Sequence, residues 1–289
     1  MAFHTTVSLA GCLLNLLLIY LAYFHSPRTI RTYSILIINF ALTDFGACFF
    51  DAFVEQRIVP TGWTLAYMSS GICRLVPSSC YISYSIMLHF YAHGLWSLLV
   101  SFAYRYYILV NTSPSGRTVI IILVMFYVPS FFQWISFIWA LDPPEKITPI
   151  LKERFPTYDL SDSVISGTVD IRSFSALFTI LHMTLPALTC QACFPSFFLL
   201  AVLCYAVGQL GIYQHPVLEY VPFSVVLFIP LLSPCASLFF VKPYRLQIEK
   251  FLGVKSAYTE KTIRLSTFQL TKASRIDSHL DPRSITINF

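Results

Sequence analysis

The sequence predicts an all-α membrane protein built from transmembrane helices. Its mean hydropathy is +0.68 and only 11% of its 289 residues are charged, whereas a soluble domain carries about a quarter charged residues. The apolar residues form solid runs, and each run reaches the length of about 20 residues that a spanning helix needs. A membrane β-barrel would instead show segments of about ten residues that alternate between apolar and polar side chains.

The expected helices follow these runs in order and form one membrane domain. The first run lacks a basic start and is followed by Arg28 and Arg31, so we expect a retained first helix and not a cleaved signal peptide. After the last run, apolar residues share one helical face, which is typical of a helix that lies on the membrane surface. The expected transmembrane helices are about 4–24, 33–54, 77–110, 118–140, 174–188, 190–212 and 220–241, followed by an amphipathic helix at 244–252 and a basic tail at 253–289.

The charges of the loops predict the orientation of these helices. From Lys242 to Phe289 there are nine basic and four acidic residues, and the rest of the chain balances at ten of each. The stretch 141–172, in contrast, holds six acidic and four basic residues. Because cytoplasmic loops carry an excess of Lys and Arg, we expect the N-terminus outside and the tail in the cytosol. A basic tail of this kind marks a cytoplasmic end, so no nucleic-acid partner is expected.

The run between Arg172 and Glu219 contains 46 residues without a charge. As a helix it would be about 70 Å long, about twice the hydrocarbon thickness of a bilayer. One crossing would place the basic tail outside, and two crossings place it inside, as its charge requires. Two crossings leave only 174–188 for the first of them, a length of about 22 Å. We therefore favour a truncated fifth helix, with no cytoplasmic loop between the fifth and sixth helices.

Seven stretches within residues 1–252 are more specific than apolar composition. They are Gln56–Tyr67, Gly71–Arg74, Ser83–Phe90, His182–Leu188, Gln191–Pro195, Gly208–Tyr220 and Leu232–Arg245. In this order they resemble the nematode serpentine receptor class d chemoreceptors, which are distant rhodopsin-like proteins with seven helices. The resemblance implies a rhodopsin-like seven-transmembrane helix bundle that binds a small environmental or pheromone-like molecule. It also implies signalling through a heterotrimeric G protein, from the plasma or ciliary membrane of sensory neurons.

The chain departs from this family where the stretches His182–Leu188 and Gln191–Pro195 are joined almost directly. Members of the family have there the inner half of helix 5, a basic cytoplasmic loop and the start of helix 6. An alternative transcript or a mispredicted exon would explain the missing block, and a degenerate gene is a less favoured explanation. A truncated, non-signalling isoform, a partner subunit of full-length relatives and a receptor dimer remain open alternatives.

The residues expected to line a ligand pocket are chosen by their depth in the helices. They are Tyr84, Met87, Leu88, His89, His93 and His182. His89 and His93 lie four residues apart and so share one helical face, a spacing that can also ligate a metal. No second cluster of acidic or His residues accompanies them, so we expect no metal, no cofactor and no enzymatic activity. Whether the two histidines line a cavity or form a satisfied core pair stays open.

The inner end of the third helix carries Tyr104, Arg105 and Tyr106. By resemblance to the receptor family, these residues correspond to the rhodopsin-like Asp/Glu-Arg-Tyr tripeptide. This correspondence implies that Arg105 and Tyr106 take part in G-protein coupling. Tyr104 replaces the acidic residue, so a local carboxylate restraint on the arginine is not expected. An arginine that only marks the membrane interface is the alternative.

A polar group is expected in the middle of the bundle. The stretch that ends at Asp44 resembles the rhodopsin-like helix-2 pattern, and a carboxylate at this depth usually has a partner. We expect Asn15 in the first helix and Ser233, beside Pro234 in the last, as its partners. Pro234 permits a kink that a moving helix can use. A structural polar cluster and a role in switching or sodium binding are both compatible with this pattern.

The cysteines indicate less about function than the motifs above do. Cys80 precedes Arg105 by 25 residues, which resembles the spacing of the receptor cysteine that usually bonds to the second outer loop. The 141–172 stretch has no cysteine, so that bridge is not expected, and Cys73 and Cys80 need another partner or stay free. A transporter or channel is the main alternative from another class, but the sequence lacks its inverted repeats and charged relays.

Overall fold

A computed structural model describes residues 2–158, 160, 163–190, 203–204, 206–208 and 216–252 of the chain. Most of the expected helix 190–212, and the tail 253–289, lie outside these residues. The helices are α1 (Ala2–Phe24), α2 (Arg31–Val54), α3 (Pro77–Val110), α4 (Gly116–Ile138), α5 (Pro144–Arg154), α6 (Phe174–Cys190), α8 (Pro216–Phe240) and α9 (Lys242–Phe251), with short 3-10 turns at Arg28–Ile30 and Ile72–Leu75. The strands are β1 (Gln56–Thr61), β2 (Thr64–Ser69) and β3 (Val164–Thr168).

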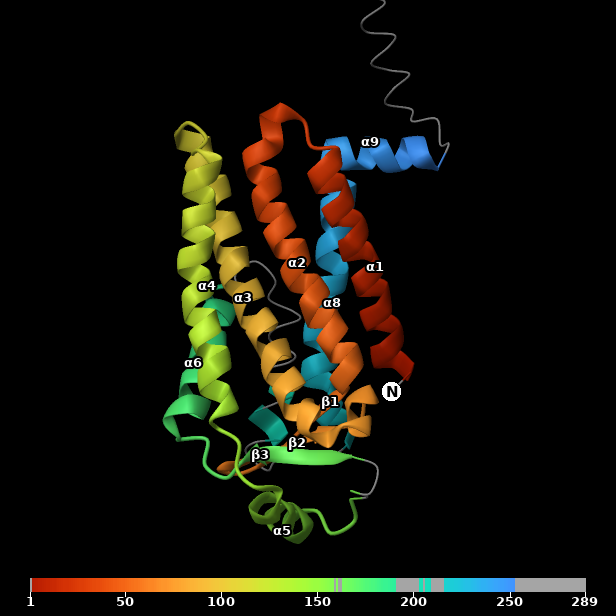
Figure 1. Cartoon of the computed structure of the whole chain (residues 1–289), viewed down its shortest axis with the longest axis vertical. Coiled ribbons are helices and arrows are strands. Elements are labelled where there is room, and N and C mark those ends of the chain that lie inside the picture. Colours follow the sequence, from red (N-terminus) through yellow and green to blue (C-terminus); the bar gives the residue numbers. More distant parts are fainter. Residues whose placement is uncertain are drawn as a thin grey trace, which may run out of the picture.

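The long helices stand side by side along the length of the molecule (Figure 1). Within the described part of the chain, α1, α2, α3 and α4 are each long and apolar enough to cross a membrane. The segment Leu227–Phe240 of α8 and the helix α9 are long and apolar enough only when they are taken together, and their axes meet at an angle of 88°. The helices α1, α2 and α3 each pack on the next helix in sequence, α6 packs on α3 and α4, and α8 packs on α1 and α2. The chain is therefore mostly helical, as the apolar runs predict.

Local signals in the sequence explain where several helices begin. Pro77 and Pro144 occupy the first turns of α3 and α5, where a missing N–H costs nothing. Ser115 caps α4, because its side chain accepts a hydrogen bond from the backbone N–H of Thr118 at 3.2 Å. The helix α2 ends at Glu55, whose backbone is left-handed (φ 46°) and turns the chain directly into β1.

A three-stranded antiparallel sheet at the end of the bundle corrects the all-helical expectation. The strand order is β1-β2-β3, and β1 and β2 are joined by the two residues Gly62 and Trp63. Gly62 has a φ of +74°, the backbone that tight hairpins require and glycine adopts without strain. The sequence prediction treated this stretch as a loop, although β-branched and aromatic residues flank a glycine turn, which is a hairpin signal.

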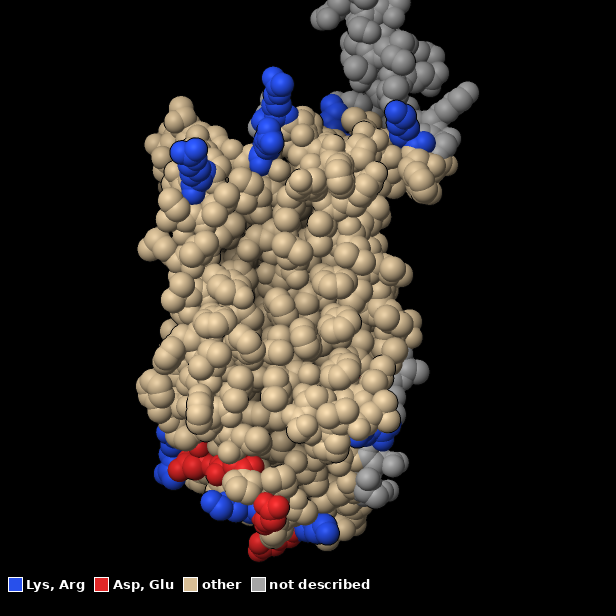
Figure 2. Space-filling model, in the orientation of Figure 1, with Lys and Arg blue, Asp and Glu red and all other residues tan. Residues whose placement is uncertain are grey.

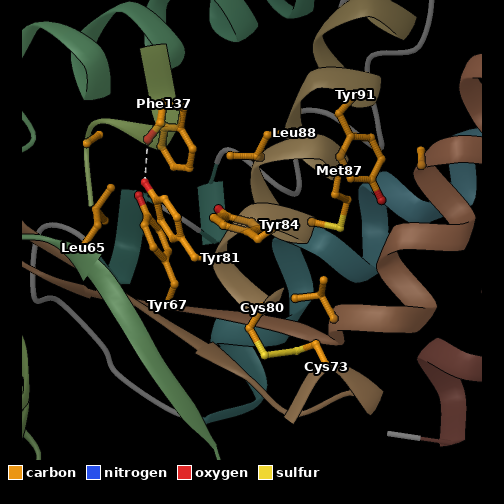
Figure 3. Packing of buried hydrophobic residues seen from close by; sticks show 13 residues of the cluster. Leu65, Tyr67, Cys73, Cys80, Tyr81, Tyr84, Met87, Leu88, Tyr91 and Phe137 are labelled. Atoms are coloured by element: carbon orange, nitrogen blue, oxygen red, sulfur yellow. Dashed lines mark hydrogen bonds between the residues drawn. A yellow bond between two sulfur atoms is a disulfide. The ribbon is translucent and has the colours of Figure 1, made fainter. Parts of the chain in front are cut away.

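The sheet and α5 together form a cap, which we define as Gln56–Ser69 and Pro144–Thr168. All six residues of β2 are buried, because the strand has apolar neighbours on both faces. On one face Ala66 and Met68 pack with Ile147, Leu151 and Phe155 of the α5 region. On the other face Leu65 and Tyr67 pack on the bundle. Here Tyr67 lies among Tyr81, Tyr84 and Phe137 (Figure 3). The cap therefore continues the hydrophobic core of the bundle.

A disulfide between Cys73 and Cys80 ties the 3-10 turn after β2 to the first turns of α3 (Figure 3). The sequence left the partners of these two cysteines open, and the structure pairs them with each other. Their separation of seven residues makes this a local bridge. It leaves the 141–172 stretch without a covalent connection to α3, because that stretch has no cysteine.

Replacing both Cys73 and Cys80 with serine is expected to lower the free energy of unfolding by about 2 to 3 kcal/mol, because the bridge restricts the unfolded chain. Thermal unfolding of the purified chain in lipid nanodiscs measures the change. Cys235→Ser, which removes an exposed free thiol, is the matched control. Equal unfolding temperatures for the double variant and the control would mean that the bridge contributes nothing to stability.

Candidate functional site

The expected pocket residues are all buried, and the structure separates them into two groups. Tyr84, Met87 and Leu88 belong to the apolar cluster directly beneath the cap, where Tyr84 contacts Tyr67 of β2 (Figure 3). His89, His93 and His182 lie among polar and aromatic side chains of α2, α3, α4 and α6 instead. The cap therefore rests on the first group, and the second group supplies the polar chemistry.

Ser130 of α4 connects His89 of α3 to His182 of α6. The Nδ1 atom of His89 lies 2.8 Å from the backbone oxygen of Ser130, and the Nε2 atom of His182 lies 3.2 Å from its hydroxyl. Ser130 is fully buried, at 0% exposure. Sequence reasoning did not single out Ser130, because a serine within an apolar run carries no signal until its neighbours are known. We call His89, Ser130, Trp134 and His182 the α3–α4–α6 cluster.

Aromatic rings surround this cluster. The ring of His89 lies 5.1 Å from that of Tyr127 and 6.1 Å from that of Trp134, measured between centroids. The ring of His182 stacks on Phe178 at 5.5 Å and lies 5.6 Å from Trp96. Aromatic rings together with a few placed polar atoms are the usual lining of a small-molecule site.

His93 faces a different neighbour from His89. Its Nε2 atom lies 3.3 Å from the amide oxygen of Asn39 and 3.3 Å from the hydroxyl of Ser97, and Asn39 also donates to Ser97 at 2.9 Å. These bonds join α2 to α3 and are typical of a core group. Among the described residues, no group of three His, Cys, Asp or Glu side chains could hold a metal ion.

The centre of the bundle holds the expected polar residues in a specific arrangement. Asp44 is buried and interacts with the side chain of Ser233 in α8, while its Oδ2 atom has no hydrogen-bond partner among the described residues. Asn15 instead donates to two backbone oxygens, those of Gly11 and Pro230, each at 2.9 Å. Pro234 has no N–H, so the oxygen of Pro230, four residues earlier, lacks its normal helical donor. Asn15 therefore satisfies the carbonyl group that the proline leaves unpaired.

A second buried carboxylate was not expected as a site. Asp51 is fully buried, and its Oδ2 atom lies 3.2 Å from Nδ1 of His4 and accepts from the hydroxyl of Ser8 at 2.7 Å. The other ring nitrogen of His4 lies 3.1 Å from the hydroxyl of Ser224 in α8. These contacts join α1, α2 and α8 near the cap. The sequence showed Asp51 only as an interruption of an apolar run.

At the opposite end of the bundle, a tyrosine holds Arg105. The Nε atom of Arg105 donates to the hydroxyl of Tyr33 in α2 at 3.1 Å, and the guanidinium group lies 5.5 Å from the centre of that ring. Tyr33 in turn stacks on Tyr104, with 5.9 Å between the ring centres. Tyr106 is 72% exposed. The side chain that restrains the arginine therefore comes from the neighbouring helix.

The helix α9 lies across this end of the bundle (Figure 1). Its Tyr244 is fully buried against α1, where its hydroxyl lies 2.8 Å from that of Ser26. Figure 2 shows that the charged side chains visible at the α9 end are basic, whereas the cap end carries both acidic and basic groups. The two ends of the molecule therefore differ in charge.

Comparison with known proteins finds one family along nearly all of the chain. The family described as "Serpentine type 7TM GPCR chemoreceptor Srd" matches residues 1–188 and 185–250. "Serpentine receptor class delta-19" of Caenorhabditis elegans is 39% identical over 293 aligned positions, which cover 86% of this chain and 86% of the relative. "Serpentine receptor class delta-18" of the same organism is 36% identical over 294 positions, which cover 86% of this chain and 87% of the relative.

Proposed function

Since this chain belongs to the Srd family of serpentine seven-transmembrane chemoreceptors, we propose that it is a G-protein-coupled chemosensory receptor for a small environmental or pheromone-like molecule. It is a multi-pass membrane protein of a receptor family, and not of an enzyme family. The observation that carries the proposal is the α3–α4–α6 cluster, which offers buried polar atoms within an aromatic environment. Tyr84, Met87 and Leu88 would form its apolar boundary toward the cap, with His93 on the side of α2.

We place the cap and the N-terminus outside the cell and the tail in the cytosol, in the plasma or ciliary membrane of sensory neurons. The basic α9 end of the molecule supports this orientation. The disulfide beneath the cap supports it independently, because disulfides persist on the oxidising side of a membrane. Arg105 and Tyr106 would then face the cytosol, where a heterotrimeric G protein binds.

We also propose that the fifth helix is truncated and that the third cytoplasmic loop is missing. The alignment with class delta-19 has 293 positions, but 86% of the 289 residues is about 249 residues. About 44 positions, the difference between 293 and 249, therefore hold no residue of this chain. The family match also divides into two pieces that meet at residues 185–188.

The missing block bears on signalling more than on ligand binding. The inner ends of the fifth and sixth helices would stand beside Arg105 at the cytoplasmic face, whereas the α3–α4–α6 cluster uses residues that the chain retains. A truncated isoform that binds ligand but does not signal, or that serves as a partner subunit, is the alternative that the alignment lengths favour. Sequencing of transcripts and genomic DNA across the codons for Pro186–Pro195 distinguishes a shortened transcript from a shortened gene.

Insertion of the corresponding block of class delta-19 between Leu188 and Thr189 is expected to raise G-protein activation by about tenfold or more, within the range of typical allosteric coupling. Nucleotide exchange on a purified G protein, with both chains in nanodiscs, measures the change. A flexible Gly/Ser insert of equal length is the matched control. Equal exchange rates for the chain and its extended form would contradict the proposal that the missing block limits coupling.

A further inference from the structure

We propose that the ligand carries a neutral hydroxyl group, which binds between the Nε2 atom of His89 and the indole N–H of Trp134. This inference rests on the proposed receptor function and adds the chemical class of the ligand. It also assigns to Trp134 a recognition role that the sequence did not indicate.

The hydrogen bond between His89 and Ser130 determines which nitrogen of the ring carries the proton. A backbone oxygen can only accept, so the Nδ1 atom of His89, 2.8 Å from the oxygen of Ser130, must donate. In the neutral ring the Nε2 atom is then an acceptor with a free lone pair. His89 is 3% exposed, and its Nε2 atom has no hydrogen-bond partner among the described residues. An unpaired acceptor in such a place costs free energy unless a donor reaches it.

The neighbouring ring of Trp134 carries a buried donor that has no partner among the described residues. The ring of Trp134 is 6.1 Å from that of His89, and the indole nitrogen of Trp134 is buried and has no partner among the described residues. An indole N–H can only donate. A hydroxyl group both donates and accepts, so one ligand oxygen can satisfy the histidine and the tryptophan together. A ketone could satisfy only the tryptophan, and an apolar group would satisfy neither.

The charges of these helices indicate a neutral ligand. The only Asp, Glu, Lys or Arg residues in α3, α4 and α6 are Arg105 and Arg117. Both lie at the α9 end of their helices, far along the chain from His89 and Ser130. The carboxylates of α2, Asp44 and Asp51, face Ser233 and the pair His4 and Ser8. A carboxylate or an ammonium group beside His89 would therefore be buried without an opposite charge from α3, α4 or α6, which is costly at this depth.

The test compares matched small molecules on the full-length chain in nanodiscs. The probes are 1-octanol, 2-octanone, octanoate and octane, with 2-phenylethanol, acetophenone, phenylacetate and ethylbenzene as a second series. Binding is measured as the shift of thermal unfolding with probe concentration. In at least one series, the alcohol is expected to bind about tenfold more tightly than the ketone and the hydrocarbon, as one or two hydrogen bonds predict.

Four variants locate the contact. His89→Asn keeps a donor for the oxygen of Ser130 but removes the Nε2 acceptor, and Trp134→Phe keeps the ring but removes the N–H. Both are expected to abolish the preference for the alcohol. His89→Gln places an amide oxygen near the position of Nε2, so this variant is expected to retain part of the preference for the alcohol. Trp139→Phe, at an exposed position beyond α4, is the control and should leave the preference unchanged. Partition of a probe into lipid is the same for all chains and cancels in the comparison.

The proposal is overturned by a preference for the ketone or the carboxylate, by an alcohol preference that survives in His89→Asn, or by the absence of any His89-dependent preference in both series. None of these measurements needs a G protein. If the alcohol preference depends on His89 while nucleotide exchange stays absent even in the extended chain, the signalling function fails and the ligand class stands. If exchange responds to other compounds, the receptor function stands and the hydroxyl assignment fails.

Discussion

Replacing Asn15 by leucine is expected to lower the free energy of unfolding by about 2 kcal/mol. The side chain is fully buried, and its amide group donates to the oxygen of Pro230, which Pro234 deprives of a helical donor. Leucine has the same branching and the same number of side-chain heavy atoms as asparagine, so the variant removes the amide hydrogen bonds while the site stays filled. The cost of a buried carbonyl without a partner is about 1 to 3 kcal/mol, although an average hydrogen bond between membrane helices contributes less.

A double-mutant cycle makes this prediction specific. Pro234→Ala restores an N–H that can donate to Pro230 within α8, so the oxygen no longer depends on Asn15. In that background, Asn15→Leu is expected to cost less than about 1 kcal/mol. Reversible unfolding of the four chains in mixed micelles measures the coupling. Equal costs of Asn15→Leu with and without Pro234 would show that the amide group stabilises the bundle by another route.

Replacing Gly71 by alanine is expected to prevent the cap from assembling. A Cβ atom at this position would lie 2.3 Å from the backbone oxygen of Phe53 and 2.7 Å from the carbonyl carbon of Val54, far inside van der Waals contact. Backbone atoms cannot give way as a flexible side chain can. The N–H of Gly71 also donates to the oxygen of Val54 at 2.9 Å, which fixes its place beside the end of α2. We expect the largest loss of stability here, beyond about 3 kcal/mol.

Surface expression in cultured cells and thermal unfolding of any recovered protein measure this effect. Gly94→Ala is the matched control. Its added Cβ atom would meet only a methyl carbon of Thr43 at 3.5 Å, an ordinary contact, and alanine favours helix more than glycine does. Normal expression and unfolding of Gly71→Ala would mean that the backbone of Gly71 does not pack tightly against the end of α2.

The sequence predicted the four long apolar helices α1 to α4 because apolar runs and charged ends are local properties of the chain. The family resemblance is confirmed, and with it the class of receptor. The sheet escaped prediction because the pairing of β2 with β3 joins residues about 100 positions apart, for example Leu65 and Thr168. The role of Ser130 escaped for a similar reason, because its partners His89 and His182 lie on two other helices.

Some of the buried polar residues could also be predicted from the sequence, and others could not. Asp44 could be singled out from the sequence because a carboxylate interrupts an apolar run. Of the two partners expected for it, Ser233 lies beside it, whereas Asn15 donates to the oxygens of Gly11 and Pro230. The position of Asn15 against Pro230 requires the register between α1 and α8, which sequence spacing alone does not supply. Asp51 interrupts the same run as Asp44, but its environment depends on His4, at the very start of α1, and on Ser224 of α8.

The local character of the Cys73–Cys80 bridge determines how the third strand is attached. Five residue pairs join β3 to β2, and no covalent bond joins the 141–172 segment to α3. Reducing agents would therefore loosen the turn before α3 without releasing that segment. Conversely, the segment could peel away from β2, exposing the apolar surface of Ile147 and Leu151, while every sulfur remained oxidised. Among the described residues, hydrogen bonds, apolar contacts and the cation–π contacts of Arg57 with Tyr158 and of Arg172 with Trp63 hold this side of the bundle closed, and all of them re-form without a redox partner.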